Sequence, residues 1–289
     1  MPSLKEIKGR IGSVQGTLKI TSAMKMVATA KLHKAQTAIE GALPYQRQLE
    51  SIMKMAVSGV AEHPLCVQRE EKKAVALVCI ASNTSLCGGY NANMVRNVTL
   101  ALEDFHREGL KVRVYVIGRK LEQSLVKWAK PHGQWLTLVR EYVGKGDKPQ
   151  YSDAARLSQT LCSDFLAGQL DGAELMYMHY RNMSSQVLTR DEFLPLTLSS
   201  GAEDVESPNI VEPTREALLE SIVPDSLATK MYAVMLDAQA AEHAARTVAM
   251  QTATDNGNEL LEELQIQYNK GRQAAITNEL LDIAGGSTQ

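Results

Sequence analysis

The segment LATKMYAVMLDAQAAEHAARTVAMQTATDNG, residues 227–257, carries a repeat of apolar and small residues. The repeat falls at alternating steps of four and three: Leu227, Met231, Val234, Ala238, Ala241, Ala245, Val248 and Thr252. This heptad spacing is typical of a helix that lies along another helix, and the alanines predict close packing. Apolar positions resume at Leu260 and Leu264, so we expect the helix to continue through Gly257, where another backbone could come close.

A second long helix is predicted over residues 1–57. Ser3 and Glu6 have the spacing of a capping box, and Leu4, Ile7, Ile11, Val14 and Leu18 follow in steps of three and four. A bend is expected near Gly41–Pro44. At 1.5 Å per residue, such a helix would be on the order of 75 Å long.

In residues 73–198 the spacing of the apolar residues changes from the helical repeat. The new pattern predicts an α/β domain. AVALVCIAS, KVRVYVIG and WLTLVREYV are strand-like segments separated by helical ones. AELMYMHYR and QVLTRDEFLPL follow a further helix and are expected to pair antiparallel. Alternating strands and helices indicate a layered, Rossmann-like domain with a mostly parallel sheet.

The last part of the chain divides into an acidic loop, residues 199–213, and a C-terminal helix, residues 214–286. Thr214 is expected to start this helix, Pro224 to end or kink it, and Asp225 or Ser226 to cap its continuation. Residues 1–34 hold seven basic residues and one acidic residue, whereas residues 201–289 hold five basic and fifteen acidic ones. We therefore predict a long antiparallel coiled coil of the two terminal helices, with the alanines facing the basic helix and the α/β domain inserted between the helices.

Composition excludes several classes of protein. The formal net charge is -2, which argues against a nucleic-acid-binding chain. The four cysteines show no CxxC spacing, so we expect reduced thiols and no zinc site. The N-terminus lacks the apolar run of a secretory signal. The longest apolar run, residues 74–81, is far shorter than the roughly 20 residues of a membrane span, so any membrane association is expected to go through a partner.

No motif for catalysis or cofactor binding stands out. SLCGGYNAN, residues 85–93, lies between a strand and a helix, where α/β folds often bind phosphate, but it lacks the P-loop and GxGxxG patterns. Tight-turn glycines with Asn91 as a helix cap are the favoured interpretation, and an α/β nucleotide-binding protein dimerised through its terminal helices is the alternative. DNGNE, residues 255–259, does not continue as a calcium loop, and the histidines form no i, i+4 pair. We expect no catalytic residue, cofactor or metal.

Three stretches resemble the gamma subunits of F-type ATP synthases. They are IKGRIGSVQGTLKITSAMKMVATAKL (7–32), LCGGYN (86–91) and EHAARTVAMQTATDNGNELLEELQIQYNKGRQAAITNELLDI (242–283), in the same order along the chain. In SNTSLCGG the sequence departs from the family, which has an acidic-basic pair before the glycines. The resemblance implies a non-catalytic rotary axle inside a hexamer of alpha and beta subunits, and a foot on the membrane c-ring beside the epsilon subunit.

The resemblance also implies a place for the complex and roles for individual residues. The chain would be a peripheral subunit at the cytoplasmic face of a bacterial plasma membrane, where it couples ion flow to ATP synthesis and regulates ATPase activity. Met24 and Lys25 would lie near the levers of the beta subunits. Arg272 and Gln273 would contact the loops around the upper axle.

Overall fold

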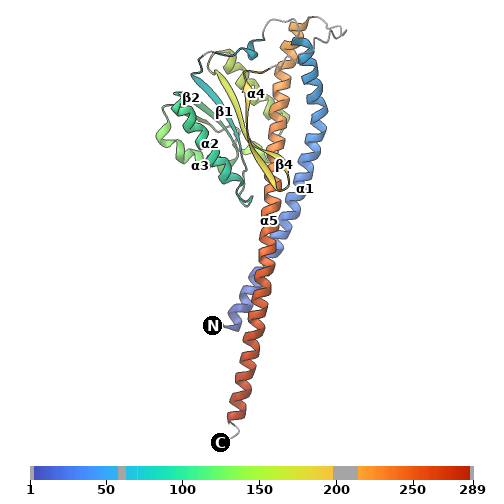
Figure 1. Ribbon diagram of the computed structural model, residues 1–289, viewed down its shortest axis with the longest axis vertical. Helices are drawn as coiled ribbons and strands as arrows, with labels where there is room; N and C mark the ends of the chain where they lie inside the picture. Colours follow the sequence, from blue (N-terminus) through green and yellow to red (C-terminus); the bar gives the residue numbers. More distant parts are fainter. Residues whose placement is uncertain (1–2, 58–62, 70, 198–213, 287–289) are drawn as a thin grey trace.

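The computed structural model describes residues 3–57, 63–69, 71–197 and 214–286. Two long helices dominate it: α1 (Leu4–Val57) and α5 (Arg215–Gly286) run antiparallel, side by side, with the α/β domain beside their upper part (Figure 1). The predicted acidic loop, residues 199–213, lies outside the described residues. None of the described helices is long and apolar enough to cross a membrane.

Both long helices start at the predicted caps. The Ser3 hydroxyl accepts a hydrogen bond from the Glu6 N–H at 3.2 Å, and the Thr214 hydroxyl accepts one from the Ala217 N–H at 3.2 Å. A helix end at Pro224, and a new cap at Asp225 or Ser226, are wrong, because α5 runs through that proline without interruption, as α1 does through Pro44. Each proline removes one backbone donor. Apolar residues on both sides of Pro224, Val223 and Leu227, are buried in the core and hold α5 in place across it.

The domain contains a five-stranded sheet in the order β3-β2-β1-β4-β5. The strands are β1 (Ala74–Ile80), β2 (Lys111–Ile117), β3 (Leu136–Val139), β4 (Gly172–Asn182) and β5 (Ser185–Leu194). The first four are parallel and β5 pairs antiparallel with β4, as the sequence predicts. The connecting helices are α2 (Tyr90–Arg107), α3 (Arg119–Ala129) and α4 (Tyr151–Leu166), with short 3-10 turns at Pro64–Cys66, Lys130–His132 and Val143–Asp147.

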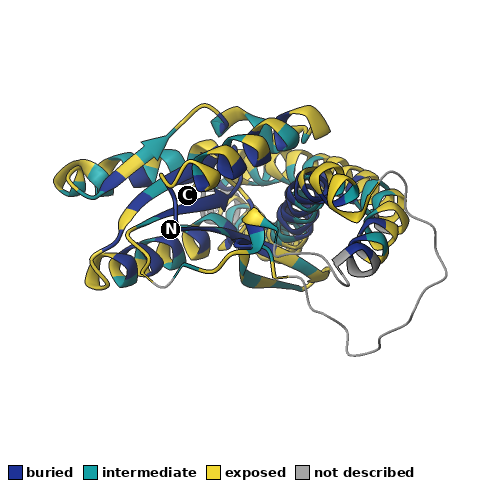
Figure 2. Ribbon diagram, turned by 90° about the horizontal axis from the view of Figure 1, so that it is seen from above, coloured by how far each residue is buried: buried dark blue, intermediate teal, exposed yellow. Residues whose placement is uncertain are grey.

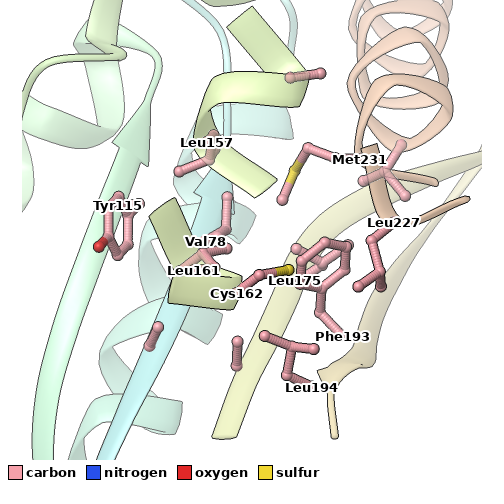
Figure 3. Packing of buried hydrophobic residues seen from close by; sticks show 14 of the residues in the cluster. Val78, Tyr115, Leu157, Leu161, Cys162, Leu175, Phe193, Leu194, Leu227 and Met231 are labelled. Carbon is pink, nitrogen blue, oxygen red and sulfur yellow. The ribbon is translucent and has the colours of Figure 1, made fainter. Parts of the chain in front are cut away.

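Helices cover both faces of the sheet, and alternate residues of β1 point to opposite faces. Val75, Leu77 and Cys79 pack against α2 and α3. Val78 packs against α4 and α5 on the other face, where Leu161 and Met231 close the core (Figure 3). Viewed along the long axis, the buried residues of the two long helices lie where the helices meet each other and the domain, and their outer faces are exposed (Figure 2). Helix α5 is therefore a component of the domain core as well as half of the helix pair.

Candidate functional site

The paired helices hold a constant antiparallel register through two leucine–glycine contacts. A Cβ atom built on Gly257 would lie 2.7 Å from Leu18 Cδ2, and one on Gly271 would lie 3.1 Å from Leu4 Cδ2. Leu4 and Leu18 are two heptads apart, and so are Gly257 and Gly271. Each leucine occupies the space left by a glycine on the facing helix, so the helix axes can approach closely at both levels.

Polar side chains join the helices between the leucine–glycine contacts and the domain. Thr254 donates to the Thr21 hydroxyl at 3.0 Å, and Lys25 Nζ donates to Gln251 Oε1 at 2.5 Å. Lys25, one of the expected partner contacts, is thus partly buried and bonded across the helix pair. Its ammonium group is held at a defined place on the surface of the helix pair.

Helix α5 continues past the start of α1. Gly271 is opposite Leu4, the first residue of α1, so residues 272–286 extend beyond the pair, a length of about 22 Å at 1.5 Å per residue. Arg272 and Gln273 are exposed at the beginning of this extension (Figure 1). Further along, the exposed apolar residues are Ile276, Leu280 and Leu281. The structure thus places Met24 and Lys25 at one height along the α1–α5 pair, and Arg272 and Gln273 at another.

Met24 lies in a groove where α1, α5 and the loop after β1 meet. The groove has a volume of about 440 Å³ and is lined by Ala23, Met24, Val27, Ala28, Lys31, Thr84, Ser85, Leu86, His243 and Arg246. Met24 is partly buried, whereas Val27 and Leu86 are more than half exposed. The groove is therefore a largely apolar surface that also includes the exposed cation of Lys31.

The alanine stripe of α5 meets a different neighbour from the one expected. Ala238 and Ala241 are buried in the two cores of the α/β domain, and Ala245 packs against the second of them. The alanines that pack on α1, against Leu32 and Ala35, are Ala240 and Ala244. Between Leu227 and Ala245 the predicted seam therefore faces the domain, because α5 has close neighbours on two sides and carries small residues toward both.

A buried arginine, which the sequence analysis missed, anchors the loop after β1 to α5. Arg246 donates to Glu242 Oε1 at 2.5 Å, to Thr84 Oγ1 at 2.7 Å and to Ser82 Oγ at 3.2 Å. Both charged residues are nearly inaccessible to solvent. The i, i+4 spacing of Glu242 and Arg246 within an alanine-rich stretch is the signal that could have indicated this ion pair.

Asn91 organises the same loop from inside and does not cap α2. Its side chain accepts from the Ser82 N–H at 3.2 Å, donates to the Thr84 carbonyl at 3.1 Å and contacts Cys87 Sγ at 3.2 Å. Gly89 occupies the cap position instead. Burial raises the pKa of the Cys87 thiol, so this cysteine is a protonated packing residue.

Helix α5 packs at the crevice in which folds of this type bind ligands. The connection from β1 leads to β2 on one side of β1, whereas the connection from β3 leads to β4 on the other side, so the switch point lies between β1 and β4, at their carboxyl ends. There Ala241 packs with Cys87 and Met178, and the Tyr90 hydroxyl donates to the Ala238 carbonyl at 3.1 Å. Helix α5 thus takes up part of the place where the nucleotide-binding alternative would put its ligand, and a pocket of about 390 Å³, lined in part by Gly88 and Gly89, remains beside it. No cluster of three or more metal-ligating side chains occurs within the described ranges.

Comparison with known proteins assigns the chain to a family. The family model described as ATP synthase matches residues 3–288. The ATP synthase gamma chain of Phocaeicola vulgatus is 48% identical over 99% of both chains, and that of Flavobacterium johnsoniae is 40% identical over 99% of this chain and 98% of its own. This chain belongs to the ATP synthase gamma chain family. The gamma chain is the central stalk of F-type ATP synthases.

Solved structures share the fold of this gamma chain. A chain of the Euglena gracilis mitochondrial ATP synthase rotor superimposes with a TM-score of 0.60 at 19% identity, covering 94% of this chain and 98% of its own. A chain of the Tetrahymena thermophila central stalk and c-ring gives a TM-score of 0.55 at 24% identity, covering 81% and 99%. The long helix pair with an α/β domain at one end is therefore the architecture of these stalks.

Proposed function

We propose that this gamma chain is the rotary shaft that couples ion flow through a membrane c-ring to ATP synthesis and hydrolysis in a hexamer of alpha and beta subunits. It contributes no catalytic residue of its own. The epsilon subunit binds beside its α/β domain, and the complex lies at the cytoplasmic face of a bacterial plasma membrane, to which this chain is peripheral. The observation that carries the proposal is a two-helix shaft with a single-helix tip at one end and a firmly attached domain at the other.

The shape of the shaft suits rotation inside a ring of subunits. Two closely packed antiparallel helices resist twisting better than one, and the leucine–glycine contacts keep the pair narrow. The domain and the α5 extension make the shaft asymmetric along its length and around its axis (Figure 1). An asymmetric shaft presents a different surface to each catalytic subunit at any moment, which is the requirement for driving identical sites through different affinities in turn.

We assign two levels of the shaft to contacts with the hexamer. Met24 and Lys25 lie at the level nearer the α/β domain, beside the groove with exposed Val27 and Leu86, and meet the levers of the beta subunits. Arg272 and Gln273 lie at the level farther from the domain, on the α5 extension. An exposed guanidinium can form a charge-assisted hydrogen bond with a carboxylate, and in this proposal Arg272 forms one with a beta subunit in one rotary state.

Reconstitution tests the function. The chain is co-expressed with alpha and beta subunits, and size-exclusion chromatography and an ATPase assay show whether one copy enters an active hexamer. We expect one copy per hexamer, and loss of hydrolysis when residues 1–34 are deleted, because that deletion removes the α1 half of the shaft from Leu4 to Lys34. The matched control is Glu122→Gln, which alters an ion pair with Arg140 inside the domain and should leave hydrolysis intact.

Two results would contradict the proposal. One is a chain that does not associate with alpha and beta subunits and forms a stable homodimer through residues 1–57. The other is a purified chain that retains a nucleotide. Either result would indicate that the α/β domain, rather than the helix pair, carries the function of this protein.

A further inference from the structure

Tyr180, near the end of β4, is one of the points where the α/β domain touches both long helices. Its hydroxyl accepts a hydrogen bond from Gln36 Nε2 of α1 at 3.0 Å. Its ring packs against the cluster in which Ala240 and Ala244 of α5 meet α1. The pairing of β4 with β5 shifts register between Tyr180 and Asn182, and such a bulge re-aims the side chains next to it.

Asp237 of α5 holds the same segment of β4 through both carboxylate oxygens. Oδ1 accepts from the Tyr180 backbone N–H at 3.0 Å, and Oδ2 lies 2.6 Å from His179 Nδ1, which donates to it. The Asp237 side chain is 17% exposed and that of His179 is 50% exposed, so the bond to the Tyr180 N–H is better shielded from water than the bond to His179. Two consecutive residues of one strand are thus bonded to α5, while the second of them is also bonded to α1.

The joint has a mechanical consequence. Much of the remaining contact between α5 and the domain is apolar, and apolar contact depends on buried area with little dependence on direction. Lys230, Gln239 and Arg246 of α5 donate further hydrogen bonds to the domain. Hydrogen bonds weaken steeply when their angle or length changes. A torque on the domain tends to turn it about the α5 axis and across α1. The bonds from Asp237 and Gln36 to β4 oppose that turn on both helices.

We propose that Tyr180 and Asp237 form a positioning joint that transmits torque between the α/β domain and the two-helix shaft, a role that rests on the proposed rotary function. Neither residue touches a nucleotide. Their function is to keep the domain in a fixed orientation relative to the shaft. In the proposed mechanism the ring acts on the domain, and the shaft acts on the hexamer. Loss of the joint lets the domain yield under load while the shaft still turns in the hexamer.

The experiment compares two double variants of the complete ATP synthase in inverted membrane vesicles. The joint variant is Tyr180→Phe with Asp237→Ala. The matched control is Tyr177→Phe with Glu174→Ala, which removes a tyrosine hydroxyl bonded to Asp191 and a carboxylate paired with Arg190. Both control positions are also on β4, but their partners are on β5, inside the domain.

Two quantities are measured: ions transported per ATP hydrolysed, and stimulation of ATP hydrolysis by an uncoupler. In the joint variant we expect the transport ratio to fall by about twofold or more, the scale on which coupling mutations act. Uncoupler stimulation should fall too, because back-pressure no longer reaches the hexamer fully. The control variant should match wild type, and Tyr180→Phe alone, which removes one oxygen atom, should shift both quantities in the same direction by less.

The outcomes separate this inference from the proposed function. A joint variant with wild-type transport ratio and wild-type uncoupler stimulation overturns the joint and leaves the rotary shaft intact. Equal losses in the joint and control variants also overturn it, because they would reflect domain stability alone. A wild-type chain that does not assemble overturns the rotary function itself.

Discussion

Leu18 of α1 fills the space that a side chain at Gly257 of α5 would need, since a Cβ atom there would lie 2.7 Å from Leu18 Cδ2 and 3.3 Å from its Cγ. Glycine inside a helix costs roughly 1 kcal/mol relative to alanine. At this level of the shaft the cost is offset by closer packing of the two helices. The pair is therefore narrow at a level where the domain no longer covers it (Figure 1).

A double-mutant cycle tests this relationship. Gly257→Ala should change the free energy of unfolding by less than about 1 kcal/mol, because the gain in helix propensity is offset by displacement of Leu18. In a Leu18→Ala background the same substitution should stabilise by about 1 kcal/mol. Urea unfolding of the purified chain measures both. Gly12→Ala, where no atom lies within 4 Å of the new Cβ, should stabilise equally in both backgrounds. Equal effects of Gly257→Ala in the two backgrounds would refute the contact.

Heptad spacing predicted that the terminal helices exist and pair. It also led to the expectation of a close approach at Gly257, and in the structure Leu18 faces this glycine. Spacing did not show which neighbour each stripe meets. Ala238 and Ala240 are two residues apart and both buried, one in the domain core and the other against α1. A helix with neighbours on two sides has a wide apolar surface, so its periodicity fits more than one phase.

The buried polar groups of the domain junction were the least predictable part. Arginine is usually exposed, and nothing local in the sequence shows that Ser82 and Thr84, more than 160 positions away, surround Arg246. The same holds for Asp237, whose partners are 57 and 58 positions distant. Such contacts depend on how the domain docks on α5, which only the tertiary structure supplies.

His243 makes the stability of the chain sensitive to acid. Burial, followed by the nearby charges of Arg246 and Lys31, lowers the pKa of His243 to about 4, although Asp147 acts in the opposite direction. The unfolded state binds a proton near pH 6.5, so stability is full above that pH and falls as pH decreases toward 4. The loss from this residue should be about 3 kcal/mol over that window.

Urea unfolding between pH 7 and pH 4 checks this prediction. His243→Gln should flatten the pH dependence, because glutamine takes up no proton in either state. The matched control is His33→Gln at an exposed position of α1, which should leave the wild-type slope unchanged. A wild-type slope in the His243 variant would show that another group is responsible.

Asp171 ties the start of β1 to the start of β4. Burial alone would raise the pKa of Asp171, but the N–H groups of Lys73 and Ala74 and the guanidinium of Arg69 together lower it. Its contribution is therefore present above about pH 4 and is lost as pH falls through the lowered pKa of the folded state. Asp171→Asn should cost about 2 kcal/mol at pH 7, since charge-assisted bonds to two backbone donors and an arginine are weakened.

Thermal and urea unfolding of the Asp171 variant measure this cost. Asp104→Asn is the matched control, because Asp104 forms an exposed pair with Arg107 within α2 and should contribute less than about 1 kcal/mol. The variant should also lose part of the acid-induced destabilisation seen in wild type. Equal stability of the two variants would contradict the role given to Asp171.

Substitution of Arg272 distinguishes an effect on partner contact from an effect on the stability of the chain. It is exposed on the α5 extension beyond Leu4, so Arg272→Ala should change the unfolding free energy of the isolated chain by less than about 0.5 kcal/mol. In the assembled enzyme, loss of a charge-assisted hydrogen bond of about 1.5 kcal/mol should lower coupled ATP synthesis and hydrolysis by about tenfold. Lys270→Ala removes an exposed cation two residues earlier and should keep near wild-type rates. Lys270 is a cation on the paired part of the helix, just before the extension, so it tests whether position on the extension matters. Wild-type rates with Arg272→Ala would contradict the proposed contact with a beta-subunit carboxylate.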